Sequence, residues 1–282
     1  MSFSSVGVVG AGTMGHGIAH VAAAAGAEVV LFDIDEPRVS AGLRKITANL
    51  DKGIEKGKLT AADRDQTLSR LRTSTDLGSL AGCGVVVEAI PERLDLKVEL
   101  FTTLEGLVGA DTVLATNTSS LSVAKVAAPL AHPERVIGTH FFNPVHIMAL
   151  LEVVVHPGTA PEVLAAVRAW GTAMGKECIV VQDFPGFATS RLGVCLGMEA
   201  IRMVEQGVAS ASDIDKAMVL GYRHPVGPLK LTDLVGLDVR MAIGEYLAKE
   251  LGNPAFQPPA LMRQMVAEGR LGQKSGKGFY DY

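Results

Sequence analysis

The stretch Ser5-Val-Gly-Val-Val-Gly10-Ala-Gly12-Thr-Met-Gly15 decides the fold that we predict for this chain. Residues 5–9 are a short apolar run typical of a buried parallel strand. Glycines follow at once, and residues 16–25 are predicted to form a helix of small residues. A second apolar run covers residues 27–32. Strand, glycine turn, helix and strand in this order predict the first unit of a Rossmann-type sheet.

The glycines have separate physical roles in this turn. Gly10 permits the tight turn, Gly12 lets a pyrophosphate approach the backbone, and Gly15 allows the helix to pack closely on the strand. The helix that follows begins with unpaired backbone amides and a partial positive charge, which attract phosphate. The turn is therefore predicted to bind a dinucleotide. The predicted contact residues are Gly10, Gly12, Thr13, Met14 and Gly15.

An acidic residue after the second strand indicates which dinucleotide binds. Asp33 lies 18 residues after Gly15, close to the expected spacing. Its carboxylate is expected to accept hydrogen bonds from the adenosine ribose and to repel a 2′-phosphate. We therefore predict NAD as the cofactor. NADP stays open as an alternative because Arg38 lies nearby in the sequence.

The chain divides into two parts of different character. Up to about residue 184, strand-like runs alternate with helix-length segments, as in a doubly wound α/β sheet. Residues 36–71 depart from this alternation, because apolar residues at helical spacing, broken near residues 57–60, predict an inserted helical hairpin. Beyond the boundary the strand patterns stop. We predict a Rossmann-type domain over residues 1–184 and an all-helical domain over residues 185–282.

Capping residues predict where several helices begin. Thr60 is expected to cap the second helix of the hairpin. In the helical part, residues 187–206 form a long amphipathic pattern, and Ser212 is expected to cap the next helix. Pro228 and Pro258-Pro259 are expected to begin two more.

Composition and charge argue against several classes of protein. The chain has 282 residues and a formal charge of −4 with interleaved signs, so we expect no nucleic-acid partner. No run of about 18 apolar residues predicts a membrane span. The chain has three cysteines and no C-x-x-C pair, which predicts reduced thiols. The first predicted strand begins too early to leave room for a signal peptide, so we predict a cytoplasmic protein. His16 and His20 have the spacing of metal ligands, but no third ligand is suggested and no metal is predicted.

A histidine beside one predicted strand and a carboxylate on the next carry the predicted chemistry. His140 follows a strand-like run at the carboxyl edge, where ligands bind in open α/β sheets, and histidine can accept a proton near neutral pH. Glu152 begins the next strand and could orient the other ring nitrogen and stabilise the imidazolium. A strand-end histidine alone is more often structural. The dinucleotide turn upstream reverses that interpretation and favours the dehydrogenation of an alcohol.

Lysines on the predicted hairpin have two interpretations. Lys45, Lys52, Lys56 and Lys58 could form a solvated face or could meet a phosphorylated ligand. Charge alone favours the solvated face.

Several segments, in order along the whole chain, resemble the 3-hydroxyacyl-CoA dehydrogenase family. They are Val8-Val-Gly-Ala-Gly-Thr-Met-Gly15, Val87-Glu-Ala-Ile-Pro-Glu92, Asn117-Thr-Ser-Ser-Leu121, His140-Phe-Phe-Asn-Pro144, Pro185-Gly-Phe187, Gly221-Tyr-Arg-His-Pro-Val-Gly-Pro228 and Lys274-Ser-Gly-Lys-Gly-Phe-Tyr280. The length is similar to that of stand-alone bacterial members. The resemblance implies NAD-dependent oxidation of an (S)-3-hydroxyacyl-CoA, in particular 3-hydroxybutyryl-CoA, and the reverse reduction.

The resemblance also implies roles for single residues. His140 is implied as the catalytic base, Glu152 as its partner, and Ser119 as the hydroxyl that contacts the substrate oxygen. The residues implied near the cofactor are Ala89, Glu92, Lys97, Asn117 and Asn143, and those implied at the substrate are Ser119, Asn143, Ser190, Lys52 and Lys56. The two lysines would meet the phosphates of the acyl-CoA. The helical domain is implied to bind substrate and to form a homodimer.

One position departs from the family pattern. Ser190 stands where the family usually carries asparagine after Pro-Gly-Phe, and serine offers one donor instead of two. Substrate identity is thus less constrained than reaction type. Two alternatives stay open: a gulonate-type sugar-acid dehydrogenase on the same scaffold, and a non-catalytic dinucleotide-binding protein like the lens crystallins that resemble this family.

Overall fold

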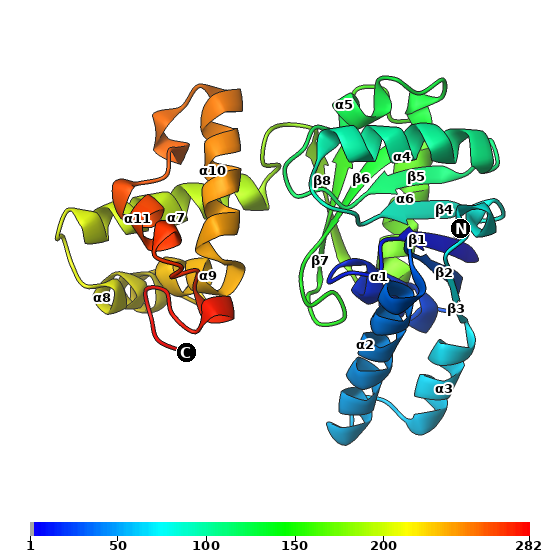
Figure 1. The fold of residues 1–282 in the computed structure, drawn as a ribbon, viewed down its shortest axis with the longest axis horizontal. Helices are drawn as coiled ribbons and strands as arrows, with labels where there is room; N and C mark the ends of the chain where they lie inside the picture. The colour runs from blue at the N-terminus through cyan, green and yellow to red at the C-terminus, as the bar shows by residue number, and fades with distance from the viewer. Residues whose placement is uncertain (1–2) are drawn as a thin grey trace. The chain divides into compact units, whose positions relative to one another are not determined.

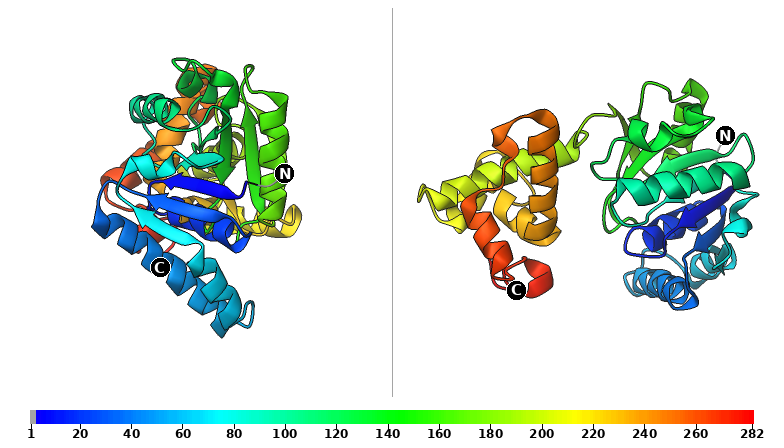
Figure 2. Two further views of the ribbon diagram at one scale, coloured as in Figure 1. Left: turned by 90° about the vertical axis from the view of Figure 1, so that its right-hand side faces the viewer. Right: turned by 45° about the horizontal axis from the view of Figure 1, so that its top comes forward.

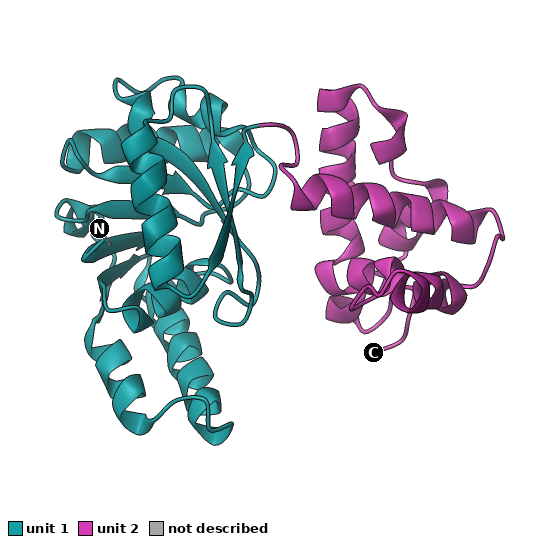
Figure 3. Cartoon of the chain, turned by 180° about the vertical axis from the view of Figure 1, so that it is seen from behind, with its two compact units in different colours: residues 1–183 teal, residues 184–282 magenta. Residues whose placement is uncertain are grey.

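The computed structural model describes residues 3–282, which belong to two compact units, Met1–Asp183 and Phe184–Tyr282 (Figure 3). Each unit has its own cluster of buried hydrophobic side chains, as expected of separate domains. In residues 3–282, no helix has both the length and the apolar character needed to cross a membrane.

An eight-stranded sheet forms the centre of the first unit (Figure 1). Its strands are β1 (Ser5–Val9), β2 (Glu28–Phe32), β3 (Leu71–Ser74), β4 (Val85–Glu88), β5 (Val113–Thr116), β6 (Val136–Phe141), β7 (Leu150–Val155) and β8 (Glu177–Gln182). Their spatial order is β3-β2-β1-β4-β5-β6-β7-β8. Neighbouring strands run parallel except β6 and β7, which pair antiparallel. The predicted Rossmann-type sheet is confirmed.

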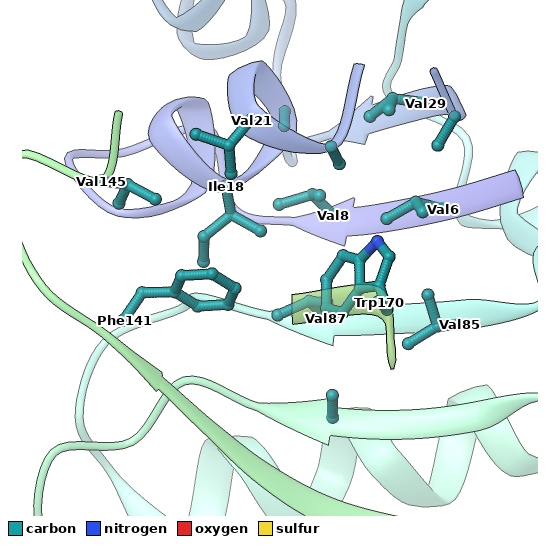
Figure 4. Close-up of a cluster of buried hydrophobic side chains, with 14 of the residues drawn as sticks. Val6, Val8, Ile18, Val21, Val29, Val85, Val87, Phe141, Val145 and Trp170 are labelled. Carbon is teal, nitrogen blue, oxygen red and sulfur yellow. The ribbon is translucent and has the colours of Figure 1, made fainter. Parts of the chain in front are cut away.

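Helices lie on both faces of this sheet (Figure 1), and its central strands are accordingly mostly apolar. The helices of the first unit are α1 (Gly15–Ala24), α2 (Glu36–Glu55), α3 (Ala61–Ser69), α4 (Leu94–Leu107), α5 (Val123–Ala127) and α6 (Pro161–Ala173). Ile18 of α1 and Trp170 of α6 join one core cluster with Val8 and Val87 of the sheet (Figure 4). Phe141, the last residue of β6, packs edge-on against Trp170 in the same cluster.

The inserted helical hairpin is confirmed. Helices α2 and α3 lie side by side and project from the sheet (Figure 1, Figure 2). Thr60 caps α3 as predicted: its hydroxyl accepts the Asp63 amide, and the Asp63 carboxylate accepts the Thr60 amide in return. Asp35 caps α2, where its side chain accepts the Arg38 amide.

Five α-helices make up the second unit over residues 184–282: α7 (Thr189–Glu205), α8 (Ala211–Lys216), α9 (Pro228–Val235), α10 (Leu237–Leu251) and α11 (Ala260–Ala267). Two buried carboxylates organise them through backbone amides. Asp215 accepts the amides of Leu229 and Lys230 at the start of α9. Asp233 accepts the amides of Phe279 and Tyr280 and so fastens the C-terminal segment to α9.

Two local predictions differ from the structure, and two elements were not predicted. The residue that caps α8 is Ser210, which pairs with Asp213; Ser212 was the wrong choice, because its partner three residues on, Asp215, is engaged at α9. Strand β3 and helix α10 were not predicted. Strand β6 also runs two residues beyond the predicted strand, so His140 lies inside it, next to its last residue.

Candidate active site

The carboxyl edge of the sheet brings His140 and Glu152 together. In the antiparallel ladder of β6 and β7 the two residues are direct cross-strand partners, so their side chains lie on the same face. His140 Nδ1 lies 2.6 Å from Glu152 Oε2. Glu152 is completely buried, and the His140 residue is 7% exposed. The predicted histidine–carboxylate pair is thus present as a buried dyad.

This contact selects the histidine tautomer. A carboxylate can only accept, so the Nδ1–H of His140 donates to Glu152 and the ring keeps its lone pair on Nε2. The neutral ring can then take a proton at Nε2, and the buried carboxylate stabilises the resulting imidazolium. The ring also packs against Phe142, with 4.5 Å between centroids. Chemically, such a dyad can act as a general base and, in reverse, as a general acid.

The loop after β5 carries the next predicted residues, Asn117 and Ser119. Asn117 is buried, and its side-chain oxygen accepts the amide of Phe141 at 2.9 Å, which joins the ends of β5 and β6. Glu92 holds the rest of the loop: one carboxylate oxygen accepts the Thr118 hydroxyl at 2.6 Å and the Ser119 amide at 2.9 Å. The half-buried Ser119 is therefore held by its backbone on a loop attached to the strand of His140.

Glu92 also belongs to a network of charged side chains that includes the buried Lys97 and Glu88. Lys97 of α4 is completely buried, and its ammonium lies 2.6 Å from Glu88 Oε1 and 3.3 Å from Glu92 Oε2. The Thr116 hydroxyl and the Ile90 amide also donate to Glu88. Burial raises the pKa of Glu88, and these donors oppose the shift. Because three donors converge on Glu88, they satisfy its ionised form.

Glu88 was missed by the sequence reasoning, although it stands inside the quoted segment Val87-Glu-Ala-Ile-Pro-Glu92. A carboxylate at the end of an otherwise apolar central strand was the available signal. Lys97 was predicted near the cofactor. Its ammonium is enclosed by the two carboxylates, and a cofactor contact for it stays a prediction.

A cleft of about 910 Å³ opens at the glycine turn. It is lined in part by Gly10, Gly12, Thr13, Met14, Asp33 and Ala89. A Cβ added at Gly12 would have no atom within 4 Å, so this backbone is open to a ligand. A Cβ added at Gly15 would lie 1.6 Å from the Gly10 carbonyl oxygen, so no side chain fits at this position of the turn. Asp33 already accepts the Ala11 amide at 2.8 Å and holds the turn.

A second pocket, of about 610 Å³, lies between α1, the helical hairpin and the loop that joins β6 to β7. We call it the basic pocket. Its lining includes Lys52, Lys56, Lys58, His16, His20, His146 and Asn143. Thr13 lines both this pocket and the dinucleotide cleft, so the two adjoin. The structure therefore brings the predicted Lys52 and Lys56 to the same pocket as Asn143, which precedes a cis proline, Pro144.

Ser190 belongs to the other unit, in the first turn of α7. Its role at the substrate stays a prediction. In residues 3–282, no group of three His, Cys, Asp or Glu side chains is arranged to hold a metal ion.

A dinucleotide cleft on a Rossmann-type sheet, next to a buried histidine–carboxylate dyad, defines a dehydrogenase with a nicotinamide cofactor. Residues 5–184 match the family described as "3-hydroxyacyl-CoA dehydrogenase, NAD binding domain", and residues 186–282 match its "C-terminal domain". The chain belongs to the 3-hydroxyacyl-CoA dehydrogenase family.

Known relatives resemble it from end to end. A 3-hydroxybutyryl-CoA dehydrogenase of Mycobacterium tuberculosis is 44% identical over 279 residues, which are 98% of each chain. A probable 3-hydroxybutyryl-CoA dehydrogenase of Bacillus subtilis is 42% identical over all of this chain and 98% of its own. The crystal structure of an (S)-3-hydroxybutyryl-CoA dehydrogenase from Ralstonia eutropha superposes with a TM-score of 0.96 at 43% identity, covering 99% of both chains.

Proposed function

We propose that this protein oxidises the 3-hydroxyl of an (S)-3-hydroxyacyl-CoA, in particular 3-hydroxybutyryl-CoA, and catalyses the reverse reduction. The observation that carries the proposal is the 2.6 Å contact between His140 and Glu152, at the same sheet edge as the dinucleotide cleft. Full-length relatives bear the name 3-hydroxybutyryl-CoA dehydrogenase, which supports the substrate class.

The chain's own residues handle the proton in this reaction. Neutral His140 accepts the 3-hydroxyl proton at Nε2, and Glu152 stabilises the imidazolium that forms. Ser119 aligns the alcohol oxygen, on a loop that Glu92 holds by its backbone. In the reduction of a 3-ketoacyl-CoA the same histidine donates the proton.

NAD supplies the hydride acceptor when it is bound. Its pyrophosphate would lie on the turn formed by Gly10, Gly12, Thr13, Met14 and Gly15, and its adenosine ribose would meet Asp33. Ala89 lines the same cleft. Glu92 and Lys97 are assigned near the cofactor, and Asn117 and Asn143 beside its nicotinamide and the substrate. Because Asp33 would repel a 2′-phosphate, we assign NAD in preference to NADP.

The CoA part of the substrate belongs in the basic pocket. Lys52 and Lys56 provide cations for its phosphates, and Asn143 lies on the loop that leads back to His140. Ser190 is assigned to the thioester end of the substrate. In this arrangement Lys52 and Lys56 bind the substrate, and the hairpin lysines are more than a solvated face.

We also propose a homodimer formed through the second unit, in the cytoplasm. Large apolar side chains are exposed on α7 and α9, including Leu192 at 72% and Leu234 at 46%, and we assign them to the dimer interface. The cysteines, Cys83, Cys178 and Cys195, form no disulfide, which fits a reducing compartment. Sedimentation at several concentrations would test the dimer, because Leu192→Arg should shift it to the monomer.

The first test is NADH oxidation with acetoacetyl-CoA, alongside NADPH and free acetoacetate. We expect rapid turnover only with the CoA ester and NADH. Turnover with free acetoacetate at the same rate would argue against the CoA assignment. NAD binding without turnover of any substrate would favour the non-catalytic alternative.

Replacing the base provides the matching variant. His140→Ala should lower turnover by about two orders of magnitude or more, because the proton acceptor is lost, and it should retain NAD binding. His132→Gln, at an exposed histidine, is the control. Undiminished turnover in His140→Ala would refute the mechanism.

A further inference from the structure

Three histidines gather at one wall of the basic pocket, where the sequence suggested no shared role for them. His16 and His20 lie one turn apart on α1, and His146 comes from the loop between β6 and β7. The rings of His20 and His146 stack with 5.4 Å between centroids and 23° between planes. The hairpin contributes Lys52, Lys56 and Lys58 to the same pocket. Six basic side chains therefore surround about 610 Å³ of space.

One of these histidines has an unsatisfied polar atom. His20 is only 6% exposed, and its Nδ1 is buried without a hydrogen-bond partner. Buried polar groups are nearly always paired, so this orphaned ring nitrogen at a pocket wall leaves His20 with hydrogen-bonding capacity that the chain itself does not use. The Nδ1 atom of His16, in contrast, already has a partner, the Gly12 carbonyl oxygen at 2.6 Å. The other ring nitrogen of His16, Nε2, takes no part in that contact.

The charges around the histidines have one sign. From α2 and the turn after it come Lys45, Lys52, Lys56 and Lys58, and before β8 the buried Lys176 donates to the carbonyl oxygens of Val145 and Met148. Among residues 3–282, those that line the pocket include no carboxylate. An arrangement of cations and imidazoles without a counter-charge favours an anion, and metal ions are disfavoured.

The same surroundings keep the histidines neutral while no anion is present. Burial, followed by the neighbouring histidines and Lys176, lowers the pKa of His20 to about 4. Burial also lowers the pKa of His16 and of His146, and nearby lysines add to both shifts. A bound phosphate would reverse this electrostatic balance, because an anion favours the protonated ring.

We propose that His16, His20 and His146 form a protonatable wall that binds the phosphorylated adenosine end of CoA and takes up protons as it binds. The inference rests on the proposed function for the identity of the ligand, and on the basic lining of the pocket for its charge. By linkage, a ligand that raises a histidine pKa binds more tightly as the pH falls. This enzyme should therefore capture CoA esters better in mildly acidic conditions.

Calorimetric binding of adenosine 3′,5′-bisphosphate tests the wall directly. The whole protein is titrated at pH 6, 7 and 8 with saturating NADH, which keeps the probe out of the dinucleotide cleft. Two buffers of different protonation enthalpy report the protons taken up. We expect Kd to be about five- to tenfold lower at pH 6 than at pH 8, with net proton uptake at pH 7. The phosphates of the probe titrate in the opposite sense, so tighter binding at low pH must come from the protein.

The double variant His16→Gln with His146→Gln removes two rings that are not fully buried, so the fold should be retained. It should lose most of the pH dependence and of the proton uptake. His132→Gln, outside the pocket, should keep both. Equal pH dependence in the double variant and the wild type would overturn the proposal, as would absence of probe binding at every pH. Since the probe has no acyl group, these outcomes are independent of whether acetoacetyl-CoA is turned over.

Discussion

Both units of this protein bury charged side chains, but they pair them with different partners. In the first unit the buried carboxylates Glu88 and Glu152 face titratable side chains, Lys97 and His140. In the second unit Asp215 and Asp233 face mainly backbone amides. Arg240, also buried there, donates to the carbonyl oxygen of Gly193.

The partner of a buried carboxylate distinguishes a group that can take part in chemistry from a group that holds the fold together. A carboxylate that accepts backbone amides holds two segments together, and neither partner can exchange a proton near neutral pH. A carboxylate next to histidine or lysine can change the protonation or the position of its partner. Burial of charge alone is therefore a poor indicator of a functional site, and the identity of the partner is a better one.

The largest expected effect comes from removing the cation of the first unit. Lys97→Met leaves two carboxylates close together without a counter-ion, and it should lower the free energy of unfolding by about 3–5 kcal/mol. Urea denaturation measures this. The double variant Glu88→Gln with Lys97→Met has an uncharged pair, so it should recover part of the loss. If the double variant is less stable than Lys97→Met, the carboxylates do not depend on this cation.

The corresponding change in the second unit should be somewhat smaller. Asp233→Ala leaves the Phe279 and Tyr280 amides and the Tyr282 hydroxyl without their acceptor, which should cost about 3 kcal/mol of stability. The control Glu245→Ala breaks an exposed ion pair with Arg263 and should have little effect. If Asp233→Ala is as stable as this control, the C-terminal segment is held by other contacts.

Removing the charge of the dyad should affect turnover more than folding. Glu152→Gln keeps the shape of the side chain but no longer stabilises the imidazolium of His140, so kcat should fall about 100-fold, or about 2.7 kcal/mol in activation free energy. Thermal unfolding should change less than in Lys97→Met. The control is Glu177→Gln, at an exposed position on β8. An unchanged kcat would remove Glu152 from the mechanism and make it an architectural carboxylate like Asp233.

The smallest expected effect concerns Asp33, which is only partly buried. Asp33→Ser should raise KM for NAD about tenfold, because a ribose acceptor is lost. It should also make NADP a better substrate than it is for the wild type. Asp35→Ser keeps a capping residue on α2 and serves as the control. If the ratio of kcat/KM for the two cofactors is unaltered, Asp33 serves only to hold the Ala11 amide.

Features with local causes could be predicted from the sequence. The glycine turn, the break at Thr60 and the helix start at Pro228 each depend on backbone conformation or capping within a few residues. The pairing of His140 with Glu152 could also be predicted, because the two residues lie on strands that are consecutive in the sequence. Strand β3 was missed because it is an edge strand without an apolar run, and only its pairing with β2 defines it.

Features that depend on distant residues could not be predicted. Ser210 and Ser212 each precede an aspartate by three residues, and only the engagement of Asp215 by α9 decides between them. The histidine wall joins α1 to a loop more than a hundred residues later, so neither His16 nor His146 signals the other. Neither segment alone carries a sequence pattern that predicts this contact.

The antiparallel pairing of β6 and β7 has a consequence for how this scaffold can diversify. The ladder holds His140 directly opposite Glu152. The connection between the two strands carries Asn143 and His146 to the basic pocket. If the proposed CoA site is right, exchanges of side chains in this connection can alter which ester is bound, while the backbone ladder that pairs His140 with Glu152 is retained. A slip of the ladder by one residue would instead turn Glu152 to the opposite face and abolish the chemistry at once.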